Sequence, residues 1–160
     1  MADKKELEQA REAFDTLCEM LDGNDWHYDK EEDDFTIMCG ARGDDLPMPI
    51  KIQVDAERQI VSLLSLLPFD VPEDKRVEIA LAVSAVNYAL VDGSFDYNFA
   101  DGTLLFRMTS SYRESKVGKT MFEYMLYLSC GTIDDYNDKF EKIINGEMTL
   151  NELVRFIQED

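Results

Sequence analysis

The segment from Asp92 to Thr109 limits the possible folds of this chain more than any other. Gly93 follows a long helical pattern, after which apolar and polar residues alternate on both sides of the dipeptide Asp101-Gly102. A type I′ turn needs positive φ at its two central positions, which favours Asp-Gly. The segment therefore predicts an antiparallel hairpin with this dipeptide at its tip.

The spacing also predicts a register for this hairpin. Counting outward from the turn, the pairs are Ala100–Thr103, Phe99–Leu104, Tyr97–Phe106 and Phe95–Met108. The aromatic and aliphatic members share one face because side chains alternate along a strand. Asp96 then lies opposite Arg107, and a slip of one residue would turn every apolar side chain to the wrong face.

The residues before the hairpin predict one helix and a set of strands. Positions 7–21 repeat apolar residues at helical spacing, and Asp22-Gly23 ends that pattern. A strand-like region follows at 26–39, with an acidic turn from Glu31 to Asp34 inside it, and further strand-like patterns lie at 48–54 and 60–67. The last is apolar on both faces, which predicts a central strand covered on both sides.

A second helix begins at Pro72 and has two apolar faces. One face holds Val77, Leu81, Ser84 and Tyr88, and the other holds Ile79, Val83, Val86 and Leu90. One face would pack on the sheet, and the other needs a further helix, a second subunit or a client protein. We choose Ile79, Val83, Val86 and Leu90 as the stripe expected to contact a partner.

The remaining residues predict further helices and complete the expected fold. A third helix spans 117–128, Gly131 breaks the pattern, a fourth spans 133–144, and Thr149 with Glu152 forms the capping box of a last one. We expect an α+β fold with an antiparallel sheet of about five strands in the order α-β-β-β-α-β-β-α plus extra C-terminal helices. The expected domain is single and covers 1–160, with 147–160 as an added C-terminal helix.

The charge of the chain restricts its partners. The formal net charge is −18, which repels nucleic acid backbones and anionic lipids. A basic or weakly folded protein matches this charge better, and solubility alone is the simpler explanation. No apolar run is long enough to span a bilayer, and the first residues lack a secretory signal. Three cysteines without a CxxC pair favour reduced thiols and a cytoplasmic location.

No pattern of residues identifies a catalytic centre, a cofactor or a metal site. His27 is the only histidine, and we interpret it as a structural strand residue. The stretch around Lys119 is similar to a phosphate-binding loop, but Arg113 stands where that motif needs glycine. Two acidic runs fail as calcium loops because Phe140 and Asp101 occupy their glycine positions.

The order of the motifs resembles the YbjN family, whose fold is that of the type III secretion chaperones. The matching segments are Leu66-Leu67-Pro68, Val71-Pro72-Glu73, Asn87, Gly93-Ser94-Phe95, Asp101-Gly102-Thr103 and Phe106-Arg107. The resemblance implies a non-enzymatic protein that binds proteins, often as a dimer, or acts as a regulator. The helix after Gly146 is an addition that could cover a surface left open in such chaperones.

The sequence thus favours a protein-binding module that contacts a protein partner or a second copy of itself. The alternatives are a structural or regulatory domain without a client, and a small-ligand-binding domain. Asn87 either bonds a partner or satisfies backbone groups near the hairpin. Asp96 and Arg107 either set the register or belong to an exposed binding strip.

Overall fold

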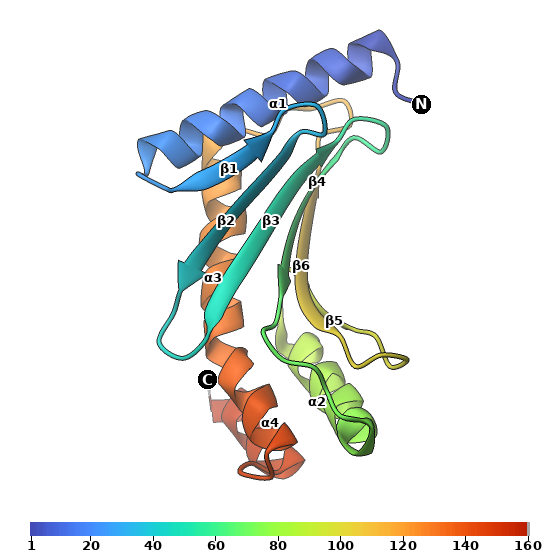
Figure 1. Ribbon diagram of the computed structural model, residues 1–160, viewed down its shortest axis with the longest axis vertical. Coiled ribbons are helices and arrows are strands. Elements are labelled where there is room, and N and C mark those ends of the chain that lie inside the picture. The colour runs from blue at the N-terminus through green and yellow to red at the C-terminus, as the bar shows by residue number, and fades with distance from the viewer. Residues whose placement is uncertain (160) are drawn as a thin grey trace.

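The computed structural model describes residues 1–159 and is built on one antiparallel sheet with helices against one of its faces (Figure 1). The strand order is β1-β2-β3-β4-β6-β5. The strands are β1 (Tyr28–Glu31), β2 (Thr36–Arg42), β3 (Pro47–Asp55), β4 (Ile60–Leu66), β5 (Ser94–Tyr97) and β6 (Leu104–Ser111). The predicted α+β class is confirmed.

Within residues 1–159 the sheet has six strands, where the sequence predicted about five. The region 26–39 forms two strands, β1 and β2, joined by the acidic turn between Glu31 and Thr36. Phe35 in this connection has a φ of 49°, so the chain reverses sharply before β2. Four strands therefore precede the second helix.

Helix α1 (Lys4–Gly23) lies across one end of the sheet (Figure 1). Asp3 caps its first turn, and the Glu6 carboxylate accepts a hydrogen bond from the Asp3 backbone in return. Phe14 and Leu17 on its inner face are buried in the core that the helices share with the sheet. The first predicted helix is confirmed.

Helix α3 (Lys119–Ile144) runs behind the sheet without interruption, so the predicted break at Gly131 is wrong. A glycine within a helix costs only about 1 kcal/mol relative to alanine. Buried side chains on both sides of it, including Leu126 and Ile133, hold the two halves in one line. Packing therefore outweighs the local propensity, and the third and fourth predicted helices are one.

Helix α4 (Leu150–Glu159) has the predicted capping box. The Thr149 hydroxyl accepts a hydrogen bond from the Glu152 backbone, and the Glu152 carboxylate accepts one from the Thr149 backbone. Leu153 is fully buried, and the ring of Phe156 packs edge-on against Tyr136 of α3. Helix α4 is thus anchored to the body of the protein.

The hairpin exists, but its register differs from the prediction by two residues. Tyr97 pairs with Leu104 and Phe95 with Phe106, which leaves a connecting loop over 98–103. Asp101 does not have the positive φ of a type I′ turn, although Gly102 does. The predicted inward face survives for Phe95, Leu104, Phe106 and Met108 because a shift of two preserves the alternation.

Internal hydrogen bonds explain the wider loop. The Asn98 side chain accepts a hydrogen bond from the Ala100 backbone, and Asp101 accepts one from the Thr103 backbone. The carbonyl of Gly102 also accepts a hydrogen bond from Val71, which ties the loop to the segment before α2. These bonds together replace the two-residue turn expected from Asp-Gly alone.

Within residues 1–159, helices cover one face of the sheet and leave the other open. Figure 1 shows α3 passing behind the strands, and the inward residues of β4, including Val61 and Leu63, are buried. The outward side chain of Leu66 is 52% exposed, and those of Ile60 and Leu64 are partly exposed. The prediction that this strand is covered on both sides is therefore wrong.

Candidate protein-binding surface

The inward face of α2 (Arg76–Ala89) is part of the core. Ile79 and Val86 are fully buried, Val83 is nearly so, and Leu90 just after the helix is half-buried. Helix α2 packs against β5, α3 and α4. The stripe chosen from the sequence to contact a partner therefore lies inside the subunit and needs correction.

The opposite face of α2 is apolar and exposed. The exposed fractions are 63% for Val77, 54% for Leu81, 94% for Tyr88 and 98% for Val91, with exposed Ser84 between them. We call these five residues the outer α2 face, which includes Val91 two residues beyond the end of the helix. No charged residue occurs between positions 79 and 91, although the whole chain has a net charge of −18. Such a patch on an acidic surface is typical of an interaction site.

Helix α4 packs beside α2 but does not cover the outer α2 face, as the exposures of Leu81 and Tyr88 demonstrate. The sequence contained a signal for the correct assignment. The inward set is wholly aliphatic, whereas the outer set includes the hydroxyl groups of Ser84 and Tyr88. Hydroxyl groups favour the side of a helix that remains in contact with water.

Asn87 lies between the two faces of α2 and bonds the neighbouring edge strand. Its Nδ2 donates to the Phe95 carbonyl at 2.9 Å, and its Oδ1 accepts from the Phe95 N–H at 2.8 Å. The amide thus bonds the strand backbone as a further strand would. Of the two roles considered from the sequence, Asn87 fills the structural one.

Two glycines allow the chain to pass close to other groups around the hairpin. Gly93 has a φ of 71°, and a Cβ there would lie 2.4 Å from the Phe106 ring. Gly102 has a φ of 85°, and a Cβ there would lie 2.3 Å from the Val71 carbonyl. Any other residue at either position would be strained and would clash, so both belong to the structural motif.

Asp96 and Arg107 form an ion pair, with 2.7 Å between Asp96 Oδ2 and Arg107 Nε. Because the register is shifted, the partners are diagonal neighbours, and Ser94 stands opposite Arg107. Both side chains are substantially exposed, so the pair contributes little to stability. The hydrogen bond from the Thr103 backbone lowers the pKa of nearby Asp101, which fixes that side chain in the loop.

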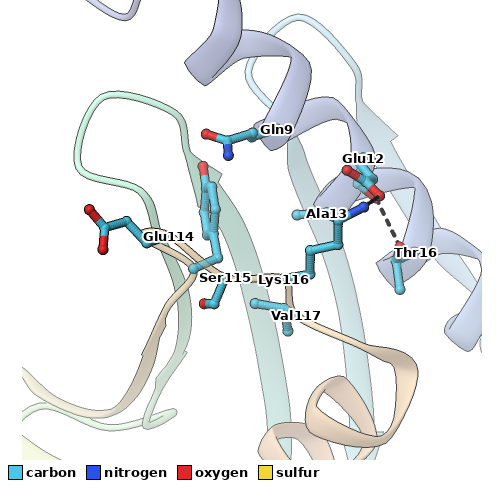
Figure 2. Close-up of a pocket in the computed structure, with 9 residues that line it drawn as sticks. Gln9, Glu12, Ala13, Thr16, Glu114, Ser115, Lys116 and Val117 are labelled. Carbon is cyan, nitrogen blue, oxygen red and sulfur yellow. Dashed lines mark hydrogen bonds and ion pairs between the residues drawn. The ribbon is translucent and has the colours of Figure 1, made fainter.

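A pocket of about 330 Å³ lies between α1 and the segment that follows β6 (Figure 2). Lys116 forms an ion pair with Glu12 across it, and the Thr16 hydroxyl donates to the Glu12 carbonyl. Glu114 lines the other side, and its φ is 55°. Lys116 and Glu12, two of the charged groups that line the pocket, therefore bond each other.

His27 lines a second, shallow hollow together with Trp26, Tyr28 and Cys39. The Tyr28 hydroxyl donates to Asp22, and burial followed by that bond raises the Tyr28 pKa. Burial raises the pKa of the Cys39 thiol to about 11, which keeps it protonated and unreactive near neutral pH.

Within residues 1–159, no group of three or more histidine, cysteine, aspartate or glutamate side chains is arranged to hold a metal ion. No helix in the same described range is both long enough and apolar enough to cross a membrane.

Comparisons with known proteins identify relatives of this fold. A crystal structure titled "Crystal structure of YbjN, a putative transcription regulator from E. coli" matches with a TM-score of 0.55 and 15% identity, covering 76% of this chain and 85% of that one. A chain of the "Structure of the HopA1-SchA Chaperone-Effector Complex" matches with a TM-score of 0.48 and 14% identity, covering 89% and 99%. No curated protein matches the sequence.

A comparison with protein families finds a match over most of the chain. The YbjN family, described as "Putative bacterial sensory transduction regulator", matches residues 13–142. The match includes α2 and the hairpin and ends within α3, before α4. The resemblance seen in the sequence is confirmed: this chain belongs to the YbjN family.

Proposed function

We propose that this protein is a non-enzymatic, chaperone-like or regulatory module that binds a protein partner, or a second copy of itself, through the outer α2 face. The single observation that carries the proposal is the exposure of Val77, Leu81 and Tyr88 on one face of α2, with Val91 exposed just after the helix and no charged residue from 79 to 91. We further propose that it acts in the cytoplasm, where Cys18, Cys39 and Cys130 would remain free thiols.

The spacing of the outer α2 face suits a helical or grooved partner. Val77, Leu81, Ser84 and Tyr88 follow the i, i+4, i+7, i+11 pattern, so they form one continuous ridge. Such ridges bind by inserting their apolar side chains into a groove or between the side chains of another helix. The small residue Ser84 would let a partner approach the helix backbone at its middle.

Charge separates the two classes of partner. A basic partner is attracted by the net charge of −18, so added salt should weaken its binding. Two copies of this chain repel each other, so added salt should strengthen self-association. The salt dependence of binding therefore identifies which kind of partner occupies the outer α2 face.

The test compares Leu81→Glu and Tyr88→Glu with the control Leu7→Glu, which changes an exposed apolar residue on α1. Light scattering at several concentrations and salt levels measures self-association, and affinity capture from the native host detects a retained protein. We expect both α2 variants to lose the associated copy or protein while their urea midpoints stay near that of the wild type. The control should keep the association.

The contrary result is equally clear. A wild type that is monomeric at every concentration, and that retains no protein sensitive to Leu81→Glu, would contradict binding through this face. A structural or regulatory domain without a client would then be the better description.

A further inference from the structure

The outer α2 face has acidic residues at both of its ends, although no charge occurs between positions 79 and 91. Residues 70–92 include two bases, Lys75 and Arg76. The same range includes five acids, which are Asp70, Glu73, Asp74, Glu78 and Asp92. Four of these acids come before the uncharged stretch and one comes directly after it, so carboxylates stand at each end of the apolar ridge.

The two bases before the ridge are already engaged. Lys75 Nζ lies 2.9 Å from Glu78 Oε2, and Arg76 Nη1 donates to the Ala100 carbonyl at 2.9 Å. Both side chains are only partly exposed. Neither base is therefore free to neutralise the remaining acids at this end of the face.

The remaining acids at this end are exposed and unpaired. Asp70, Glu73 and Asp74 are exposed to solvent, and none of them forms an ion pair in the described part of the chain. Glu73 and Asp74 lie four and three residues before Val77, in a short helical turn that leads directly into α2. That spacing brings both of them to the side of the chain that Val77 occupies.

The other end of the face is negative for two reasons. The last turn of α2 has no basic residue, so the partial negative charge of the helix C-terminus is not offset there. Asp92 adds a full charge three residues beyond Ala89, and the Tyr124 hydroxyl donates to its carboxylate at 2.6 Å. The helix dipole accounts for acids before a helix but not for an acid after it.

Given the proposed function of this face, on which the inference rests, we propose that its partner is an amphipathic helix of another protein with lysine or arginine at both ends of its apolar stripe. Val77 and Tyr88 are eleven residues apart, which is about 16 Å along a helix. A partner helix laid along the ridge therefore needs about three turns between its cations. Apolar contacts supply affinity, and the carboxylates at the two ends fix the position of the partner.

A second copy of this chain fits the face less well than a basic helix. In a parallel pair Asp92 would lie near Asp92, and in an antiparallel pair Asp92 would lie near Asp74. Either alignment brings like charges together at the ends, and each copy carries a net charge of −18. The uncharged middle of the face offers no cation that would compensate.

The experiment uses the full chain and three fluorescein-labelled synthetic helices of the same length and the same leucine–alanine stripe. Their ends carry lysine, glutamine or glutamate, and fluorescence anisotropy measures the affinity at low and moderate salt. We expect the lysine-ended helix to bind about tenfold or more tightly than the glutamine-ended one, and the glutamate-ended helix to bind most weakly. Added salt should bring the three affinities together.

Two double variants separate local from general attraction to this acidic chain. Asp74→Asn with Asp92→Asn removes one acid from each end of the face, and asparagine at 92 can still accept the Tyr124 hydrogen bond. Asp33→Asn with Asp34→Asn removes two exposed acids from the turn between β1 and β2, far from α2 (Figure 1). Only the first variant should lose about tenfold in affinity for the lysine-ended helix, while both keep the urea midpoint of the wild type.

Leu81→Glu makes failure of this inference distinct from failure of the proposed function. Helices that bind equally well whatever their ends, but that Leu81→Glu releases, would leave the face as a binding site and overturn the basic partner. An equal loss in the two double variants, or helix binding that Leu81→Glu does not affect, would also overturn it. A wild type that self-associates through Leu81, and that the lysine-ended helix does not dissociate, would assign the face to a second copy instead.

Discussion

The two faces of α2 are both largely apolar but lie in opposite environments. Ile79 and Val86 on the inward face are fully buried, whereas Leu81 and Tyr88 on the outer face are mostly exposed. Both faces hold residues that would be ordinary in a core. Apolar periodicity therefore shows how many faces of a helix avoid water. It does not show which of these faces is covered by the rest of the same chain.

The largest expected effect separates the two faces by stability. Ile79→Ala should lower the free energy of unfolding by about 2–5 kcal/mol because it leaves a cavity in a closed core. Leu81→Ala should change it by no more than about 0.5 kcal/mol because its side chain is already exposed. Urea unfolding of both variants makes the measurement, and similar losses would break the comparison.

The next largest effect concerns α4, which packs against α2. Leu153→Ala in α4 should cost about 2–4 kcal/mol because Leu153 is fully buried where α4 packs on the body. Association through the outer α2 face should be unchanged, as α4 does not cover it. A stability near that of the wild type would mean that α4 contributes little to closing the inward side.

Substitution of Asn87 tests the two hydrogen bonds made at the boundary between the faces of α2. Asn87→Ala removes both bonds to the Phe95 backbone and should cost about 1–3 kcal/mol. Hydrogen exchange at the Phe95 amide should accelerate at the same time. Asn87→Asp is the control, since a carboxylate still accepts from the Phe95 N–H but no longer donates to its carbonyl. Unchanged exchange in Asn87→Ala would show that these bonds do not protect the strand.

The smallest expected effect is a pH dependence of stability. It arises from Asp138 in α3 and not from the outer α2 face. Burial alone would raise the pKa of Asp138, but bonds from Lys142 and Lys139 overcome it and lower that pKa. The ion pairs of Asp138 therefore stabilise the fold at pH values above the ordinary aspartate pKa of about 3.9. This stabilisation is lost as the pH falls through the lower pKa that Asp138 has in the folded protein.

Asp138→Asn checks this sign. At neutral pH the variant should be less stable by about 1 kcal/mol, because its lysine partners are partly in water. The difference should shrink as the pH falls below about 3.9. Urea unfolding across pH measures it, and a constant difference would place the effect in packing instead of charge.

The sequence predicted most of the elements and failed where packing decides. The α1 pattern, the strands and the α4 capping box were all readable, because each depends on residues close in sequence. The continuity of α3 through Gly131 was not, since distant side chains hold its halves together. The hairpin register shifted because Val71, far from the turn, bonds the loop at Gly102.

The candidate surface was half predicted. The sequence showed that α2 has one apolar face more than the sheet can cover. The prediction, however, placed Val83 and its neighbours on the outside. Apart from the hydroxyl groups of Ser84 and Tyr88 on the outer side, it is the packing of α2 against β5, α3 and α4 that shows which side is filled. The uncovered face of the sheet was missed because residues 60–67 are apolar on both faces, which gave no sign that one side of β4 lacks a covering layer.

The bonds of Asn87 also bear on how this protein behaves when it is crowded. An edge strand with unpaired backbone groups can pair with the edge strand of another copy, which leads to polymerisation. At Phe95 both backbone groups are occupied, and the opposite border at β1 is only four residues long and carries Asp29, Lys30 and Glu31. Concentrated solutions should therefore resist fibre growth from either border, and any assembly that does form should use side chains.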